Sequence, residues 1–197
     1  MAERIIFHID VNSAFLSWTA AYRVRVLGET FDLRTVPSVI AGDRKSRHSI
    51  ILAKSAPAKK YGIQTGEPLG KAMEKCPQLV VAEPDYALYV TASQSLIALL
   101  REYSPEVEQF SIDEAWVDMT GTTGLYGPPV LAANRLRERI REELGFTVNI
   151  GISCNKLLAK MAGDFEKPDK THTLFPGEIP TKLWTLPVRE LFMVGRM

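Results

Sequence analysis

The chain has 197 residues, of which 46% are hydrophobic, and a formal net charge of +1. A chain of this length and hydrophobic content can bury the core of one domain or of two small ones, and its near-neutral charge points to no anionic partner. Every apolar run is too short for a signal peptide or a membrane span, so we exclude membrane insertion. The two cysteines, Cys76 and Cys154, have no metal-ligand spacing, which argues against a zinc site or a disulfide framework and fits a reducing cytoplasm.

Charge is distributed unevenly along the chain. Residues 41–75 carry eight Lys and Arg against three Asp and Glu, a net charge of +5. Residues 101–118 carry one Arg against six Asp and Glu, a net charge of −5. An acidic run of this kind occurs either on an ordinary acidic surface or near bound cations, and composition leaves both interpretations open.

The first elements predicted along the chain are a strand and a helix that meet at Asp10. Residues 4–9 are mostly β-branched or aromatic, as in a buried strand, and Asp10 ends this run. Asn12 or Ser13 is a suitable N-cap for the helix that follows. That helix is expected to end at Gly28 and to bury one apolar stripe, formed by Phe15, Trp18, Tyr22 and Val26.

A hairpin and a short helix are predicted next. Residues 36–40 and 49–54 have the composition of two short strands, with the basic segment 42–48 as the tip between them. Ser55 is placed to cap a brief helix that ends at Gly62.

The second half of the chain alternates predicted helices and strands. The helices are expected over residues 91–103, 130–144 and 155–165, and the strands over 147–153 and over both halves of 106–119. This order predicts an α+β architecture, in which a mainly antiparallel sheet has helices on one face. It also allows Asp10 and Asp113 to lie on adjacent strands.

Three acidic residues have the chemistry of a metal site. Asp113 and Glu114 interrupt an otherwise apolar hairpin, and Asp10 follows the first strand. Phosphoryl transfer by two Mg²⁺ ions about 3.5 to 4 Å apart needs carboxylates of this kind. Acids at strand ends are also common as solvated turn residues. Packing against Phe110 and Trp116 favours the metal hypothesis, because neighbouring carboxylates in apolar surroundings resist ionisation unless a cation offsets them.

Three motifs carry a resemblance to a known family. Residues 111–118, Ser-Ile-Asp-Glu-Ala-Trp-Val-Asp, resemble the SIDEA(Y/F)xD signature of the Y-family translesion DNA polymerases of the DinB and UmuC type. Residues 9–15 resemble the N-terminal metal motif of that family, and residues 151–160 resemble its GIS-x-NK-x-x-AK motif. All three occur in the order and spacing of the family.

The resemblance implies a subdomain organisation. The palm would comprise residues 1–13 and 82–166 as a mainly antiparallel sheet backed by helices, and residues 14–81 would form a small α/β fingers subdomain. Residues 167–197 would begin a helical thumb that is incomplete, and the C-terminal DNA-binding domain of the family would be absent. The chain is therefore expected to be an N-terminal fragment.

The resemblance also assigns roles to individual residues. Asp10 and Asp113 would bridge two Mg²⁺ ions, for which Mn²⁺ could substitute, while Glu114 would hold the metal at the primer 3′-hydroxyl and Val11 would contribute a carbonyl oxygen. The nucleotide would be bound by Phe15 as the steric gate against a 2′-hydroxyl, by the backbone at Ala14, and by Lys59 and Lys160. The periodicity alone favours Phe15 as a core aromatic residue, and only its position in the motif points to the gate.

The fingers motif departs from the family pattern. The family has Ser-Tyr-Glu-Ala-Arg where residues 55–59 are Ser-Ala-Pro-Ala-Lys. Ala56 can neither stack nor donate a hydrogen bond, and Lys59 is a point charge that cannot bind phosphate bidentately as Arg does.

The activity implied by the resemblance is template-directed DNA synthesis past damaged bases. Its partners would be primer-template DNA, a dNTP and, through the C-terminal region, a sliding clamp, in the bacterial cytoplasm at the nucleoid. Two alternatives remain: a non-catalytic scaffold in a damage-response complex, which Ala56 favours, and a nucleotidyl cyclase, although the Gly-Gly-Asp-Glu-Phe-type turn of cyclases is missing.

Overall fold

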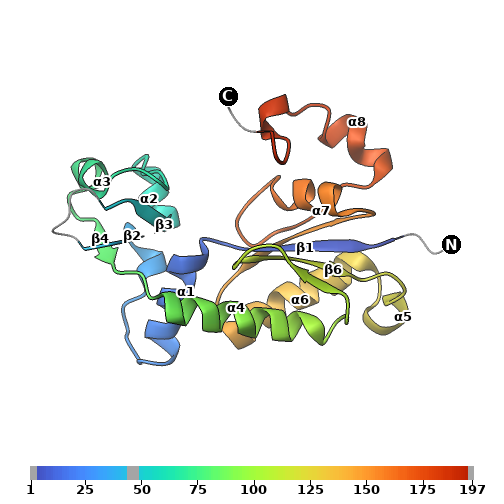
Figure 1. The fold of residues 1–197 in the computed structure, drawn as a ribbon, viewed down its shortest axis with the longest axis horizontal. Helices are drawn as coiled ribbons and strands as arrows, with labels where there is room; N and C mark the ends of the chain where they lie inside the picture. Colours follow the sequence, from blue (N-terminus) through green and yellow to red (C-terminus); the bar gives the residue numbers. More distant parts are fainter. Residues whose placement is uncertain (1–3, 44–48, 195–197) are drawn as a thin grey trace. The chain divides into compact units, whose positions relative to one another are not determined.

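The computed structural model describes residues 4–43 and 49–194, and the chain divides into two compact units (Figure 1). One unit comprises residues 1–12 and 93–197, and the other comprises residues 13–92. The expected boundaries of palm, fingers and thumb stay predictions.

A five-stranded sheet forms the centre of the first unit, in the strand order β5-β6-β1-β7-β8. These strands are β1 (Ile6–Val11), β5 (Val107–Gln109), β6 (Glu114–Asp118), β7 (Val148–Ser153) and β8 (Thr171–Thr173). All neighbouring strands are antiparallel except β7 and β8, so the expected mainly antiparallel sheet is confirmed. The predicted end of the first strand at Ile9 is wrong, because Asp10 and Val11 continue the pairing with β7.

Helices cover both faces of this sheet, which corrects the expectation of helices on one face. Helix α7 (Lys156–Gly163) lies on one face and α6 (Pro129–Leu144) lies on the other (Figure 1). Every residue of β1 and β7 is buried as a result. In β7 one set of alternating side chains is apolar, and the other contains Gly151, against which α7 packs.

Gly151 explains how closely α7 approaches the sheet. A Cβ atom at this position of β7 would lie 1.9 Å from the carbonyl oxygen of Ala159 and 2.3 Å from the amide nitrogen of Gly163, both in α7. Only glycine permits that approach. Asn155 begins the helix, since its side chain accepts a hydrogen bond of 2.9 Å from the amide of Leu158.

The remaining helices of the first unit are short except for α4 (Tyr86–Arg101), whose first residues belong to the second unit. Helix α4 begins five residues before the predicted start at Thr91. Helix α6 ends at Gly145, with a φ of 82°, as predicted. The other elements are α5 (Thr123–Tyr126), α8 (Ile179–Lys182), η2 (Pro176–Glu178) and η3 (Val188–Glu190).

The second unit is a small α/β structure around a three-stranded sheet in the order β3-β2-β4. Its elements are α1 (Ala14–Arg25), η1 (Leu33–Thr35), β2 (Ser38–Ala41), β3 (Ile51–Lys54), α2 (Ala56–Lys60), α3 (Leu69–Lys75) and β4 (Val80–Ala82). The predicted hairpin is confirmed as the antiparallel pair β2–β3, while its basic tip, residues 44–48, lies outside the described residues. Strand β4, which pairs parallel with β2, and helix α3 were not predicted, because the prolines at 68, 77 and 84 indicated only breaks.

Two sequence predictions in the second unit have opposite outcomes. Ser55 caps α2 as expected, since its hydroxyl accepts a hydrogen bond of 3.1 Å from the amide of Ala58. The predicted apolar stripe of α1 is wrong, because Tyr22 and Val26 are 37% and 67% exposed. The helix instead buries Leu16, Trp18 and several small residues near its start.

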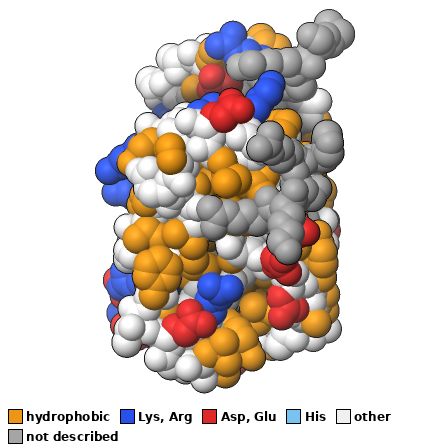
Figure 2. Space-filling view, turned by 90° about the vertical axis from the view of Figure 1, so that its left-hand side faces the viewer, with side chains coloured by type: hydrophobic (Ala, Val, Ile, Leu, Met, Phe, Trp, Pro, Cys, Tyr) orange, Lys and Arg blue, Asp and Glu red, His pale blue; other side chains and the backbone are white. Residues whose placement is uncertain are grey.

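The surface is mixed in character. On the face drawn in Figure 2, hydrophobic, basic and acidic side chains are interspersed. Some charges are neutralised locally; Lys75 in the predicted basic region, for example, lies 2.6 Å from the carboxylate of Glu67. No helix of the described part of the chain is long and apolar enough to cross a membrane.

Candidate active site at the end of strand β1

The three predicted carboxylate residues come together at one end of the neighbouring strands β1 and β6. Asp10 near the end of β1 is the pairing partner of Glu114, the first residue of β6. The amide of Val11 donates a hydrogen bond of 3.1 Å to the carbonyl oxygen of Asp113. Residues more than 100 positions apart in the chain are therefore adjacent because of sheet register. The hydroxyl of Ser111 fixes the acidic turn by donating to Asp113 Oδ1 over 2.8 Å.

Two lysines pair with these acids. Lys160 Nζ forms an ion pair with Glu114 Oε1, and Lys167 Nζ forms one with Asp10 Oδ2. Asp164 lies between the lysines, with Oδ1 at 2.8 Å from Lys167 Nζ and Oδ2 at 3.8 Å from Lys160 Nζ. The end of β1 is thus a cluster of alternating charges.

Sequence analysis identified Lys160 in this cluster but missed Lys167. Lys160 belongs to the motif at residues 151–160, and it is 8% exposed on α7. Lys167 follows α7 in a loop, where no periodicity marks a functional side chain. The one signal in the sequence that could have identified Lys167 was its position a few residues after that motif.

Burial shapes the acid–base properties of Asp10 and Lys167. Asp10 is 8% exposed, and this burial, together with the nearby Glu114, raises the pKa of its carboxyl group against the opposing effect of Lys167. Burial would lower the pKa of Lys167, but Asp10 and Asp164 outweigh it and raise the pKa. A buried carboxyl group whose pKa is raised gains stability from any further cation that approaches it.

His8 lies two residues before Asp10 in β1, so its side chain is on the same face of the strand as that of Asp10. It is fully buried, and Nε2 is 3.7 Å from Glu114 Oε1. Burial, with the positive charge of Lys160 nearby, lowers the pKa of His8 to about 3. His8 is therefore neutral near pH 7. Within the described part of the chain, neither of its ring nitrogens has a hydrogen-bond partner.

The side chains suit divalent cations in type, although they are not arranged around one. Among the described residues, no group of three or more His, Cys, Asp or Glu is placed to hold a metal ion. Asp10 and Glu114 are bound to lysines instead. Carboxylate oxygens are the ligands that Mg²⁺ prefers, and the convergence of three such residues fits that ion. The metal-ligand roles of Asp10, Val11, Asp113 and Glu114 stay predictions.

The other predicted site residues lie in the second unit. Phe15 stacks on Tyr89 with ring centroids 4.4 Å apart and an interplanar angle of 6°, and Tyr86 meets its edge at 6.3 Å. Ala14 is the buried first residue of α1, and Lys59 is exposed in the last turn of α2. Phe15 is half-buried and packs against an apolar cluster of the second unit. Its role as a steric gate, with the nucleotide contacts of Ala14 and Lys59, stays a prediction.

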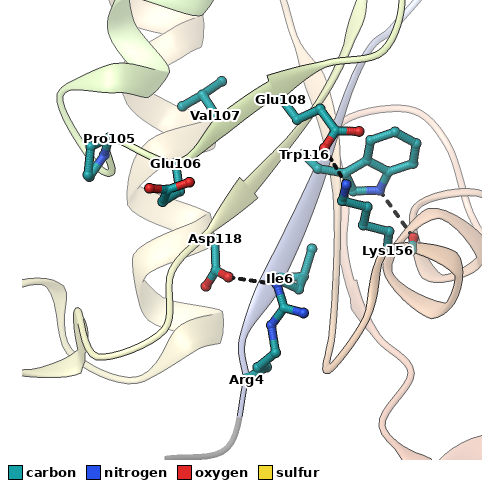
Figure 3. Close-up of a pocket in the computed structure, with 9 residues that line it drawn as sticks. All are labelled: Arg4, Ile6, Pro105, Glu106, Val107, Glu108, Trp116, Asp118 and Lys156. Carbon is teal, nitrogen blue, oxygen red and sulfur yellow. Dashed lines mark hydrogen bonds and ion pairs between the residues drawn. The ribbon is translucent and has the colours of Figure 1, made fainter.

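A pocket of about 440 Å³ in the first unit is separate from the acids (Figure 3). It is lined by Arg4, Ile6, Pro105, Glu106, Val107, Glu108, Trp116, Asp118 and Lys156. Its two cations are already paired, Arg4 with Asp118 at 3.0 Å and Lys156 with Glu108. None of the three converging acids lines it, so it is not the candidate site.

Comparison with known families shows the family to which the chain belongs. Residues 9–164 match the model of the impB/mucB/samB family, and this match contains all three predicted motifs. This chain belongs to the impB/mucB/samB family. The predicted resemblance to the Y-family polymerases is confirmed by this match together with the named relatives and solved structures below.

Several curated relatives are named DNA polymerase IV. The chain is 55% identical over 195 residues to DNA polymerase IV of Clostridium acetobutylicum, covering 98% of this chain and 48% of the relative. It is 46% identical over 164 residues to DNA polymerase IV of Moorella thermoacetica, covering 83% of this chain and 41% of the relative. The chain therefore spans about half the length of the relatives it matches.

Solved structures share the fold. An insertion ternary complex of Dbh DNA polymerase has a TM-score of 0.82 with 24% identity, and DinB from Sulfolobus solfataricus has 0.81 with 25% identity. Each comparison covers 97% of this chain and 54% of the other. The predicted α+β fold is confirmed by this likeness.

Proposed function

We propose that this chain is the catalytic part of a DNA-directed DNA polymerase of the translesion type, which transfers a deoxynucleotide from a dNTP to a primer 3′-hydroxyl. The convergence of Asp10, Asp113 and Glu114 at the end of β1 carries the proposal. Membership of the impB/mucB/samB family and relatives named DNA polymerase IV support it.

In this proposal the acids hold two Mg²⁺ ions, with Mn²⁺ as a substitute. Asp10, Asp113, Glu114 and the carbonyl group of Val11 would hold these ions. When bound, such ions would supply neutralisation of the charge that develops on the phosphoryl group and alignment of the attacking hydroxyl with the leaving pyrophosphate.

The two lysines of the site supply contacts for the triphosphate. Lys160 and Lys167 already lie within ion-pairing distance of the acids. With cations at those carboxylates, the ammonium groups would be available to phosphate oxygens, and such charge-assisted hydrogen bonds are among the stronger ones in proteins. The family motifs also imply nucleotide contacts by Lys59 and the backbone at Ala14, and a role of Phe15 in excluding a 2′-hydroxyl.

The partners in this proposal are primer-template DNA and a dNTP, with recruitment by a sliding clamp through a C-terminal region and location at the nucleoid in the cytoplasm. A non-catalytic scaffold is the alternative, because Ala56, exposed at the start of α2, lacks the functional group of the family tyrosine. Retention of three converging acids argues against it.

Primer extension tests the proposal. The assay uses this chain joined to the C-terminal half of the Clostridium acetobutylicum relative, with Mg²⁺ or Mn²⁺ and each dNTP in turn. Templated incorporation is expected, and Asp113→Ala should abolish it. Glu108→Ala, which removes an exposed acid of β5, is the matched control and should retain it. A cyclic product would support the cyclase, and DNA binding without incorporation would support the scaffold.

A further inference from the structure

The loop that carries Lys167 is held in place by a buried polar network. Lys167 is one of the residues between the end of α7 at Gly163 and the start of β8 at Thr171. A loop lysine normally samples many rotamers, so a fixed ion pair with Asp10 requires a fixed backbone.

Asn149 lies at the centre of this network. It is fully buried in β7 and is the pairing partner of Asp10 on the neighbouring strand. Its side-chain nitrogen donates hydrogen bonds to the carbonyl oxygens of Gly163 over 3.0 Å and Glu166 over 2.7 Å. Its side-chain oxygen accepts a hydrogen bond of 3.3 Å from the amide of Lys170. The contacts to residues 166 and 170 bracket Lys167.

Asn12, directly after the end of β1, anchors the same loop. Its side-chain nitrogen donates to the side-chain oxygen of Asn149 over 3.1 Å, and its oxygen accepts a hydrogen bond of 2.9 Å from the amide of Asp169. Arg137 of α6 adds an ion pair of 2.7 Å to Asp169 Oδ1. The loop is thus fixed on both sides of Lys167 by side chains from three separate parts of the chain.

We propose that Asn149 is a positioning residue, which together with Asn12 fixes the loop of residues 164–170 so that the ammonium group of Lys167 stands at Asp10. Placement of Lys167 should help to bind the triphosphate, and this catalytic consequence of the inference rests on the proposed function. The placement itself is a property of the metal-free chain.

A role of Asn149 in stability alone would explain only some of its hydrogen bonds. The contact with Gly163 satisfies a carbonyl group at the end of α7 and would be needed in any fold of this kind. The contacts with Glu166 and Lys170 serve only the loop. Val148 and Ile150 beside Asn149 are apolar, and a buried amide costs more to desolvate than an apolar side chain unless its hydrogen bonds are used.

Acylation of lysines in the chain alone tests the placement without DNA or nucleotide. The amine of Lys167 is engaged in ion pairs with Asp10 and Asp164, so Lys167 should react slowly with an amine-acylating ester. In Asn149→Ala, its acylation rate relative to the exposed Lys71 should rise about threefold or more, because the released loop no longer holds the amine in its ion pair. Asp10→Asn is the positive control.

Ser153→Ala is the matched control for lost stability. Ser153 is fully buried on the same strand and donates a hydrogen bond to the carbonyl oxygen of Leu174, far from Lys167 in the register of β7. Its substitution should leave the relative acylation rate of Lys167 unchanged. If Asn149→Ala does not fold, Asn12→Ala, at a half-buried position, removes the second anchor and should raise the same rate. Equal rates in wild type, the folded anchor variants and Ser153→Ala would overturn the inference.

Steady-state incorporation by the chimera described above then tests the consequence. Asn149→Ala should raise the KM for dNTP about tenfold with little change in kcat, and it should add less than about twofold in a Lys167→Met background, because both variants lose the same contact. Full additivity would show that Asn149 does not act through Lys167. If acylation responds as expected but the wild type incorporates no nucleotide, the proposed function fails while the placement stands.

Discussion

The charged cluster around Asp10 and the aromatic cluster around Phe15 are built in different ways. The first unites β1, β6, α7 and the loop after α7, which lie far apart in the sequence, through sheet register and ion pairs. The second stacks side chains of α1 and α4, and it depends on shape and apolar burial. The charged cluster is therefore sensitive to small shifts of backbone, whereas the aromatic cluster is sensitive to loss of volume.

Gly151→Ala should have the largest effect on the charged cluster. The added methyl group would overlap the backbone of α7, so the helix must move away from the sheet and take Lys160 with it. We expect a loss of about 3 kcal/mol or more in the free energy of unfolding, measured by urea denaturation. Gly124→Ala is the control, since a methyl group there meets nothing within 4 Å. Equal stability of the two variants would contradict the close approach.

His8→Phe should remove a pH dependence of stability that belongs to the charged cluster. The pKa of His8 falls from 6.5 to about 3 on folding, so neutral His8 contributes stability above pH 6.5 that is lost as the pH falls toward 3. The expected slope is about 1.4 kcal/mol per pH unit in that window. Urea denaturation of the metal-free chain at several pH values measures it. An unchanged slope in the variant would show that His8 accepts a proton in the folded state.

Phe15→Ala tests whether the aromatic cluster around Phe15 also selects the sugar of the nucleotide. If Phe15 is the steric gate, its loss raises ribonucleotide incorporation relative to deoxynucleotide incorporation by about tenfold or more, which corresponds to about 1.4 kcal/mol of discrimination. Tyr22→Ala, an exposed aromatic residue of the same helix, should leave this ratio unchanged. Primer extension with paired nucleotides measures it, and unchanged sugar discrimination would leave Phe15 with its core role alone.

The two helix caps should show the smallest effects. Ser55 is buried and its hydroxyl also donates to the carbonyl oxygen of Val36 over 2.7 Å, whereas Asn155 is exposed and accepts one capping bond. Ser55→Ala should cost about 2 kcal/mol and Asn155→Ala about 1 kcal/mol in thermal denaturation. The reverse order would show that burial does not strengthen the cap of α2.

Local signals in the sequence were sufficient for much of the fold. The cap at Ser55, the stop at Gly145 and the apolar hairpin around Asp113 each depend on neighbouring residues, and each is present in the structure. The stripe on α1 failed because periodicity assumes a single buried face. Helix α1 buries its first half among several neighbours and exposes its end.

The sequence by itself determined the acids, the order of most elements and, through three motifs, the family. Tertiary structure alone decided that Lys167 stands at Asp10, that Asn149 supports its loop, and that Gly151 admits α7 to the sheet. The physical reason is that these contacts join residues separated by 8 to 157 positions, and their geometry depends on strand register and helix packing rather than on adjacent residues.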